Sequence, residues 1–305
     1  MKQKKLIIAA GTSFLGQVLV NYFKDKFKEI VILTRGKHQI IENVKIVNWD
    51  AKTLTGWENE LENSTCIINL AGKSVDCRYT TVNKSEILSS RIDSTKIIGE
   101  AVLKCKNAPK HWLNSSTSTI YRHSEDKQMT EEDGEIGDDF SMNVAKTWEK
   151  TFFESETPQT LKTALRTSIV LGKKGGAFIP IKRLTQFGLG GKQGNGNQFI
   201  SWIHETDFAR TIEFIIEQKM IGVVNLISPK PTLNSEFMQQ LRKTMSIPFG
   251  LPIPTAVLKI GAKIIGTETE LVLKSRNVIP DRLLKNGFKF EFDNLNKTFL
   301  NLIAK

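Results

Sequence analysis

Short apolar runs alternate along the chain with segments whose apolar residues recur at helical spacing, and this alternation constrains the fold more than any other feature. The pattern predicts strands over 5–9, 30–34, 44–48, 65–70, 111–115 and 161–171, and helices over 14–24, 83–106 and 139–155. Strands that alternate with helices indicate βαβ units and a parallel sheet. The expected fold class is therefore α/β, with a doubly wound parallel sheet.

The alternation of strand and helix patterns ends at about Gly172. Residues 188–197 read GLGGKQGNGN, which indicates a glycine-rich turn, and an amphipathic helix over 293–303 closes the chain. We expect a nucleotide-binding domain over 1–172, completed by part of 198–228. A smaller, mostly helical lobe is expected over 173–305, on the substrate side, with a helical domain at about 250–300.

Composition limits the classes of function. Cys66, Cys77 and Cys105 lack CxxC spacing, and the 4 histidines form no ligand pattern, so we expect reduced thiols in a cytoplasmic protein and no metal. No apolar run is long enough to span a bilayer, so no membrane partner is expected. The basic N-terminus imitates a secretory leader, but the helical pattern that follows favours a first strand.

The net charge of +11 comes from lysines scattered along the chain. Scattered lysines favour solvation, and a nucleotide ligand is compatible with them, whereas nucleic-acid binding would rest on charge alone. The expected partner is a small-molecule substrate, with no nucleic acid, and the chain is expected to be a monomer or a homodimer.

The stretch IIAAGTSFLGQ at 7–17 has the form of a phosphate-binding loop with few glycines. In a dinucleotide site, glycines allow a tight turn and let the backbone approach a pyrophosphate at the helix N-terminus. Ala10 and Ser13 stand where further glycines are expected, and a φ above zero would cost a serine about 1 kcal/mol or more. The stretch is either an ordinary strand–turn–helix or a cofactor loop formed by Gly11, Thr12, Ser13, Phe14, Leu15 and Gly16.

The expected second strand ends in LTRGK, without the acidic residue that holds the ribose in NAD-binding proteins. Thr34, Arg35 and Lys37 suit a 2′-phosphate instead, which predicts NADP(H) in preference to NAD(H). Asp50 is a candidate cap for the adenine. Leu70, Ala71 and Gly72 follow the fourth strand and are candidate cofactor contacts, because the small Ala71 and Gly72 would let the backbone pass close to the cofactor.

Several motifs together carry a family resemblance: AGTSFLG, LTRGK, INLAG, SSRIDST, SSTSTIY, RTSIVLG and WIHETDFAR. The chain resembles an extended or atypical short-chain dehydrogenase/reductase, and more narrowly the NAD(P)-binding epimerase family proteins, which are sugar-nucleotide epimerase-like. Those proteins carry RWT…SR, GLGGPIGSGRQ…WIH and an uncharacterised C-terminal domain. This chain offers RYT…SSR at 78–91, GLGGKQGNGNQFISWIH at 188–204, and a matching tail.

The resemblance covers essentially the whole chain and implies a Rossmann core with bound NADP(H) and a second lobe. It implies an oxidoreductase or epimerase that acts on a small carbonyl or hydroxyl compound, with nucleotide sugars among the candidates. His204 and Asp207 of WIHETD are expected to order the backbone.

The superfamily transfers a proton through a tyrosine and a lysine four residues later. Lys146 fits, but Met142 stands in the place of the tyrosine, and a thioether cannot exchange a proton. Tyr121 is therefore the predicted acid, with Ser116 or Thr117 polarising a carbonyl.

Each assignment has a structural alternative. Lys146 would be a surface lysine of a helix, and Tyr121 would pack between the lobes. Arg166 either braces the cofactor or substrate, or is buried with carboxylates. Because of Met142, an NADPH-binding sensor or scaffold without turnover is the alternative function.

Overall fold

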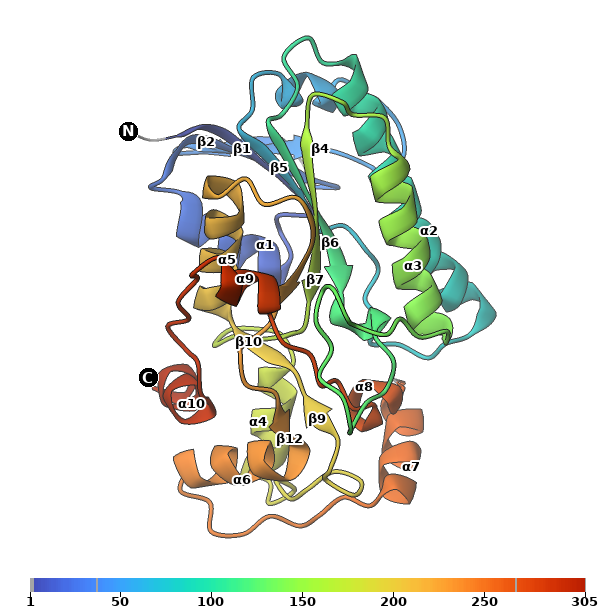
Figure 1. The fold of residues 1–305 in the computed structure, drawn as a ribbon, viewed down its shortest axis with the longest axis vertical. Helices are drawn as coiled ribbons and strands as arrows, with labels where there is room; N and C mark the ends of the chain where they lie inside the picture. Colours follow the sequence, from blue (N-terminus) through green and yellow to red (C-terminus); the bar gives the residue numbers. More distant parts are fainter. Residues whose placement is uncertain (1–2, 37, 267, 305) are drawn as a thin grey trace.

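Figure 1 shows the computed structural model, which describes residues 3–36, 38–266 and 268–304. An eight-stranded sheet occupies its upper part, in the order β11-β7-β6-β5-β1-β2-β4-β3. Its strands are β1 (Gln3–Ala9), β2 (Phe27–Thr34), β3 (Gln39–Ile41), β4 (Val44–Asn48), β5 (Cys66–Asn69), β6 (His111–Thr117), β7 (Leu161–Thr167) and β11 (Gly222–Leu226). Neighbouring strands are parallel except β3 and β4. The expected α/β class with a doubly wound parallel sheet is confirmed.

The strand order reverses beside β1. The chain builds outward from β1 to β2 and β4 on one side, and then from β5 to β6 and β7 on the other. Ligands of open α/β sheets bind outside the carboxyl ends of the strands at such a reversal. The carboxyl ends of β1, β2 and β5 therefore mark the expected position of a ligand.

Helices cover both faces of the sheet. Leu6 and Ile8 of β1 pack in one core cluster with α1 (Phe14–Phe23) and α5 (Glu205–Glu217), whereas Ile7 and Ala9 pack in another with α2 (Thr81–Lys104) and α3 (Phe140–Glu154). Figure 1 shows α2 and α3 together along one side of the sheet. Burial on both faces explains why the central strands read as continuous apolar runs.

The strand expected over 161–171 is two strands. β7 ends at Thr167 in the main sheet, and β8 (Ile169–Leu171) pairs with β10 (Trp202–His204) in the second lobe. The break lies at Ser168, whose backbone N–H donates to Leu226 O at 3.3 Å. The chain later returns, because α5 packs on α1 and β11 pairs with β7 at the sheet edge.

The second lobe, at the bottom of Figure 1, is mostly helical. It contains α4 (Phe178–Gln186), α6 (Asn234–Thr244), α7 (Thr255–Ile265), α8 (Glu270–Leu273), α10 (Leu295–Ile303) and the strand pair β9 (Phe199–Ile200) and β12 (Thr232–Leu233). Helix α9 (Asp281–Lys285) lies beside β11, and the short 3-10 helices are η1 (Trp57–Leu61) and η2 (Ser118–Ile120). Within the described ranges, no helix combines the length and apolar character needed to cross a membrane.

Candidate functional site

In the turn after β1, the residue with a strained backbone is Ala10. Ala10 has φ 59°, in the left-handed region, and its N–H donates to Leu33 O at 2.8 Å. Ser13 is extended, with φ −69° and ψ 168°, and its Oγ accepts from Gly16 N at 3.2 Å. The serine therefore serves as the N-cap of α1, a position that favours this residue type.

The two glycines of the loop allow close packing. A Cβ added to Gly16 would lie 2.4 Å from the Gly11 backbone, and one added to Gly11 would lie 2.9 Å from Ile32 Cγ2. Helix α1 can therefore sit directly against the turn and against β2. Close helix–strand packing is one of the roles that glycines have in dinucleotide loops.

The N-terminus of α1 has free donors. The Gly16 N–H donates to Ser13 Oγ, and the Gln17 N–H donates to Ser13 O. The side-chain Nε2 of Gln17 donates to Gly11 O. The N–H groups of Phe14 and Leu15 are left without an acceptor among the described residues. A helix N-terminus with free N–H groups binds anions such as phosphate, so this end of α1 fits a pyrophosphate.

The side chains of Phe14 and Leu15 have packing roles. The Phe14 ring lies against a glycine loop, because a Cβ at Gly172 or Gly175 would come within 2.4 Å of it. Leu15 packs against the core on the α1 side of the sheet. Any contact of these two residues with a cofactor would therefore come mainly from their backbones.

The end of β2 presents a basic side chain to solvent. Arg35 is exposed and forms no ion pair with any of the described residues, and Asn48 Nδ2 donates to Gly36 O at 3.1 Å. Thr34 Oγ1 lies 3.1 Å from Thr12 Oγ1, which joins this strand end to the loop after β1. Lys37 lies outside the described residues.

The Asp50 side chain accepts hydrogen bonds within the turn that follows β4. Its Oδ1 accepts from Lys52 N at 2.8 Å and from Thr53 N at 2.9 Å, and its Oδ2 accepts from Thr53 Oγ1 at 2.6 Å. The hydrogen bonds from Thr53 lower the pKa of Asp50. The carboxylate therefore orders the backbone after β4.

The loop after β5 completes the strand-end region. Leu70 N donates to Ala9 O at 3.1 Å, and Ala71 N donates to Asn69 Oδ1 at 3.0 Å. Asn69 is fixed in turn by Asn114 Oδ1 at 2.8 Å. A Cβ at Gly72 would lie 3.2 Å from Arg91 Cζ, so this glycine makes room for an arginine of α2.

The predicted acid, Tyr121, lies in a buried polar cluster. Its hydroxyl accepts from Arg166 Nη1 at 2.8 Å and donates to Asn225 Oδ1 at 3.1 Å. Arg166 forms a two-pronged ion pair with Glu149, at 2.9 and 2.8 Å, and Ser116 Oγ donates to Glu149 at 2.5 Å. Tyr121 is 0% exposed, and burial raises its pKa. The structure thus brings Ser116, Tyr121 and Arg166 together, beneath the surface.

The other predicted catalytic groups lie apart from this cluster. Thr117, at the end of β6, uses its Oγ1 to cap η2 by accepting from Thr119 N. Lys146 lies near the surface of α3, with its Nζ 2.6 Å from Asp138 Oδ1. Met142 is buried and packs against Gly137, where a Cβ would lie 2.1 Å from the sulfur.

A second phenol lies at the boundary between the lobes. Tyr79 is half-buried, its ring packs on Phe140 with centroids 4.9 Å apart, and its hydroxyl donates to Glu270 Oε1 at 3.1 Å. Ser141 also donates to Glu270. Burial, and the nearby carboxylate of Glu270, raise the pKa of Tyr79.

Sequence reasoning did not select this group, and only part of it was accessible to that reasoning. Tyr79 follows the expected cofactor loop, and Ser141 directly precedes Met142. Glu270, by contrast, is 191 residues from Tyr79, and no spacing rule connects them.

Comparison with known proteins adds a family context. Residues 6–226 match the NAD dependent epimerase/dehydratase family, and residues 253–302 match a domain of unknown function, DUF1731. An epimerase family protein of Staphylococcus aureus is 33% identical over 306 residues, covering 99% of this chain and 100% of the relative. Epimerase family protein YfhF of Bacillus subtilis is 32% identical over 302 residues, covering 98% of each chain.

Solved structures are similar over the same length. The human epimerase family protein SDR39U1 (isoform2), solved with NADPH, has a TM-score of 0.85 and 26% identity, covering 98% of each chain. The UDP-N-acetylglucosamine 4-epimerase of Methanobrevibacter ruminantium, solved with UDP-N-acetylmuramic acid, has a TM-score of 0.77 and 19% identity, covering 99% of this chain and 98% of that one. At 19% identity, the similarity to the Methanobrevibacter ruminantium protein shows a common fold.

Proposed function

The chain belongs to the NAD dependent epimerase/dehydratase family, and on this premise we propose that it is an NADP(H)-dependent oxidoreductase or epimerase. Its substrate would be a small carbonyl or hydroxyl compound, with nucleotide sugars among the candidates, and we propose a cytoplasmic location. The free state of Cys66, Cys77 and Cys105 supports the location.

The residues at the end of β2 are the main support for a preference for NADP(H) over NAD(H). An acidic residue at this position would hydrogen-bond a ribose 2′-hydroxyl and repel a 2′-phosphate. This chain instead has Thr34 and an exposed Arg35 without an ion pair among the described residues. A guanidinium matches a phosphate in charge and geometry. The NADPH in the similar human protein gives independent support.

We propose roles in cofactor binding for the other residues near Arg35. The N–H groups of Phe14 and Leu15 would hold the pyrophosphate, with Gly11, Thr12, Ser13 and Gly16 shaping the loop. Leu70, Ala71 and Gly72 would line the cofactor, and Lys37 would assist Arg35. Asp50 would border the adenine through the turn that it orders.

The chemistry needs a proton donor and acceptor as well as a hydride. When bound, the nicotinamide supplies or accepts the hydride. Tyr121 is the proton donor predicted from the sequence. Ser116 lies in the same buried cluster, whereas the predicted catalytic groups Thr117 and Lys146 lie apart from it. Arg166, predicted to brace the cofactor or substrate, donates to the Tyr121 hydroxyl. Tyr79 is the competing phenol, because its half-buried hydroxyl lies beside Ser141 and Glu270, whereas the Tyr121 hydroxyl is enclosed.

The proposal is tested by fluorescence titration of the protein with NADPH and, separately, with NADH. NADPH should bind more tightly, and Arg35→Ala should weaken NADPH roughly ten- to a hundredfold, the value of a hydrogen bond to a charged group. NADH affinity should change little. Arg183→Ala is the matched control, since Arg183 is an exposed arginine on α4 in the second lobe.

Equal weakening of both cofactors by Arg35→Ala would contradict the NADP(H) assignment. If neither cofactor binds, the fold serves something other than redox chemistry. Tight NADPH binding without turnover of any carbonyl compound would favour a sensor or scaffold. The buried Met142 in the place of the family tyrosine is the observation that keeps this second function open.

A further inference from the structure

Helix α7 turns an apolar face toward solvent. Val257, Ile260 and Ile264 recur at the spacing of one helical face, and these residues are 54%, 63% and 78% exposed. The opposite side of the helix meets the protein through the buried Ala262 and the half-buried Leu258. A helix of 11 residues gains most of its stability when its apolar face is packed. The outward face of α7 therefore indicates a binding surface.

More apolar residues are exposed in two loops near the start of α7. They are Phe187 and Leu189 after α4, and Phe249 and Leu251 before α7. The loops are joined, because Leu251 N donates to Gly188 O at 2.8 Å. Figure 1 shows the loop between α6 and α7 along the lower end of the second lobe. We call the outward face of α7 and these four loop residues the docking surface, since an exposed apolar patch marks an interaction site.

The docking surface lies in two stretches of positive charge. Residues 181–200 and 237–266 contain no Asp or Glu. Their basic residues form no ion pair with any described residue, and they are Lys182, Arg183, Lys192, Arg242, Lys243, Lys259 and Lys263. Lys259 and Lys263 are exposed and lie one helical turn apart at the edge of the outward face of α7.

The carboxylates that border these stretches are engaged or lie on another face. Glu268 contacts Arg78 at 3.1 Å, and Glu270 contacts Lys274 at 2.8 Å. Glu236 lines a hollow between α6 and α10. The cations around the docking surface are therefore left to attract an anionic partner.

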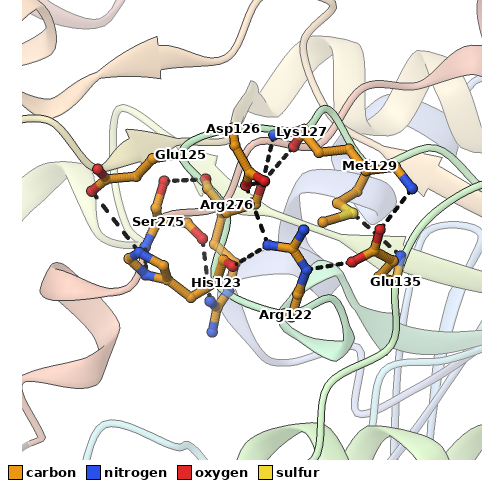
Figure 2. A network of polar contacts seen from close by, with 10 residues as sticks. Arg122, His123, Glu125, Asp126, Lys127, Met129, Glu135, Ser275 and Arg276 are labelled. Atoms are coloured by element: carbon orange, nitrogen blue, oxygen red, sulfur yellow. Dashed lines mark hydrogen bonds and ion pairs between the residues drawn. The ribbon is translucent and has the colours of Figure 1, made fainter.

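Helix α7 is held on both sides along the chain. Before the helix, Ile253 N donates to Lys192 O at 2.9 Å. After it, the segment that follows α8 is fastened to the first domain. Figure 2 shows the contact of Ser275 with His123, in which Ser275 N donates to His123 Nδ1 at 3.0 Å. The helix therefore presents its outward face from a fixed base.

The charge and shape of the docking surface favour a membrane over a protein partner. A two-fold dimer pairs identical patches, so a second copy of the chain would bring like charges together. A peptide that binds as a helix needs a groove. Helix α7 instead projects, because no described atom apart from its own helix backbone lies within 4 Å of a Cβ added at Gly261. An anionic bilayer offers negative charge and apolar depth at one flat surface.

We propose that the docking surface binds the face of an anionic lipid bilayer. Val257, Ile260 and Ile264 would enter the boundary between headgroups and acyl chains, while Lys259 and Lys263 would reach the lipid phosphates. The expectation of no membrane partner rests on the lack of a spanning segment, and binding from one face needs none. The inference does not depend on the proposed function, and it gives a role to the domain of unknown function, which contains α7.

The test is cosedimentation of the full chain with vesicles of phosphatidylcholine alone, or of an equal mixture of phosphatidylcholine and phosphatidylglycerol. The mixed vesicles should bind the protein in a saturable manner, and more weakly as the salt concentration rises. Ile260→Ser with Ile264→Ser should weaken this binding about tenfold or more, because less apolar area enters the bilayer. Lys259→Gln with Lys263→Gln should have an effect of similar size.

Two double variants are matched controls. Ile40→Ser with Ile41→Ser removes two exposed isoleucines from β3, the outermost strand of the main sheet. Arg122→Gln with Lys127→Gln removes two positive charges from residues that contact Glu135 in Figure 2. Both controls should change vesicle binding little. Because Ile260 and Ile264 are exposed, their replacement should leave the unfolding midpoint unchanged.

Three results would overturn the inference. The first is a lack of binding to the mixed vesicles, or equal binding to both kinds of vesicle. The second is unchanged binding after Ile260→Ser with Ile264→Ser. The third comes from analytical ultracentrifugation of the protein without lipid. A dimer that the two isoleucine replacements abolish would assign the docking surface to a second copy of the chain.

Discussion

At the scale of single residues, the cofactor loop keeps glycine where a methyl group would collide with the backbone. Gly16 is such a position, because its added Cβ would lie 2.4 Å from Gly11. Ala10 takes φ 59° at a cost of about 1 kcal/mol, and Ser13 contributes the helix cap instead of a glycine. The loss of two glycines is therefore tolerated by the fold.

The two competing phenols are separated by removing each hydroxyl. Tyr121→Phe should lower the free energy of unfolding by about 1–3 kcal/mol, because Arg166 and Asn225 lose a buried partner. If Tyr121 is the acid, this variant should also abolish turnover and leave NADPH affinity unchanged. Urea unfolding and NADPH oxidation, with a substrate found by screening, are the measurements.

Tyr79→Phe is the matched variant, since its hydroxyl is half-buried and should cost less stability. A fully active Tyr121→Phe enzyme removes Tyr121 from the mechanism. Loss of turnover in Tyr79→Phe alone would transfer the role to Tyr79.

At the scale of elements, the closing part of the chain is tied to the start of α5. His204 stacks on Phe292 with ring centroids 3.7 Å apart, and its Nδ1 accepts from Thr206 N. Asp207 accepts from Glu291 N at 2.9 Å and from Phe292 N at 2.7 Å. Both side chains order backbone, as WIHETD predicts, and they hold α10 in position.

Helix α10 depends on one aromatic side chain for its packing. Phe299 is 0% exposed and lies against the rings of Phe178 and Phe237. Phe299→Ala should lower the free energy of unfolding by about 3–5 kcal/mol. In hydrogen exchange, α4, α6 and α10 should lose protection before α2 and α3.

Leu300→Ala, at the next position of the same helix, is the control, because Leu300 is 56% exposed. Its effect should stay within about 0.5 kcal/mol. Equal effects of the two substitutions would contradict the packing account.

At the scale of the whole molecule, two buried histidines couple stability to pH. Burial lowers the pKa of His111 and of His204 from 6.5 to about 4. Between these values the unfolded chain binds more protons than the folded one, so stability is full above pH 6.5 and falls as the pH drops toward 4. Each histidine contributes up to about 1.4 kcal/mol per pH unit.

Urea unfolding measured from pH 7 to 4 tests this coupling. In His204→Asn, the free energy of unfolding should depend less steeply on pH, by the contribution of one histidine. His38→Asn, at an exposed position, is the control. An unchanged slope in His204→Asn would show that His204 does not contribute to the acid sensitivity.

Much of the fold was determined by local sequence. The central strands are buried on both faces, so each reads as a continuous apolar run, and the expected strands and main helices are found close to their predicted positions. The family resemblance is confirmed because its motifs are local strings. The exception is the strand expected over 161–171, which is interrupted at Ser168, so that β7 pairs in the main sheet and β8 pairs with β10 in the second lobe.

The assembly of the site was decided by the tertiary structure. Sequence alone proposed the loop of Gly11–Gly16, the acid-free end of β2 and the absence of a phenol at Met142, because each is read within a few residues. The enclosure of Tyr121 by Arg166 and Asn225 and the contact of Tyr79 with Glu270 join residues that are far apart in the chain. Burial and hydrogen bonding between distant segments set these properties, and no local pattern encodes them.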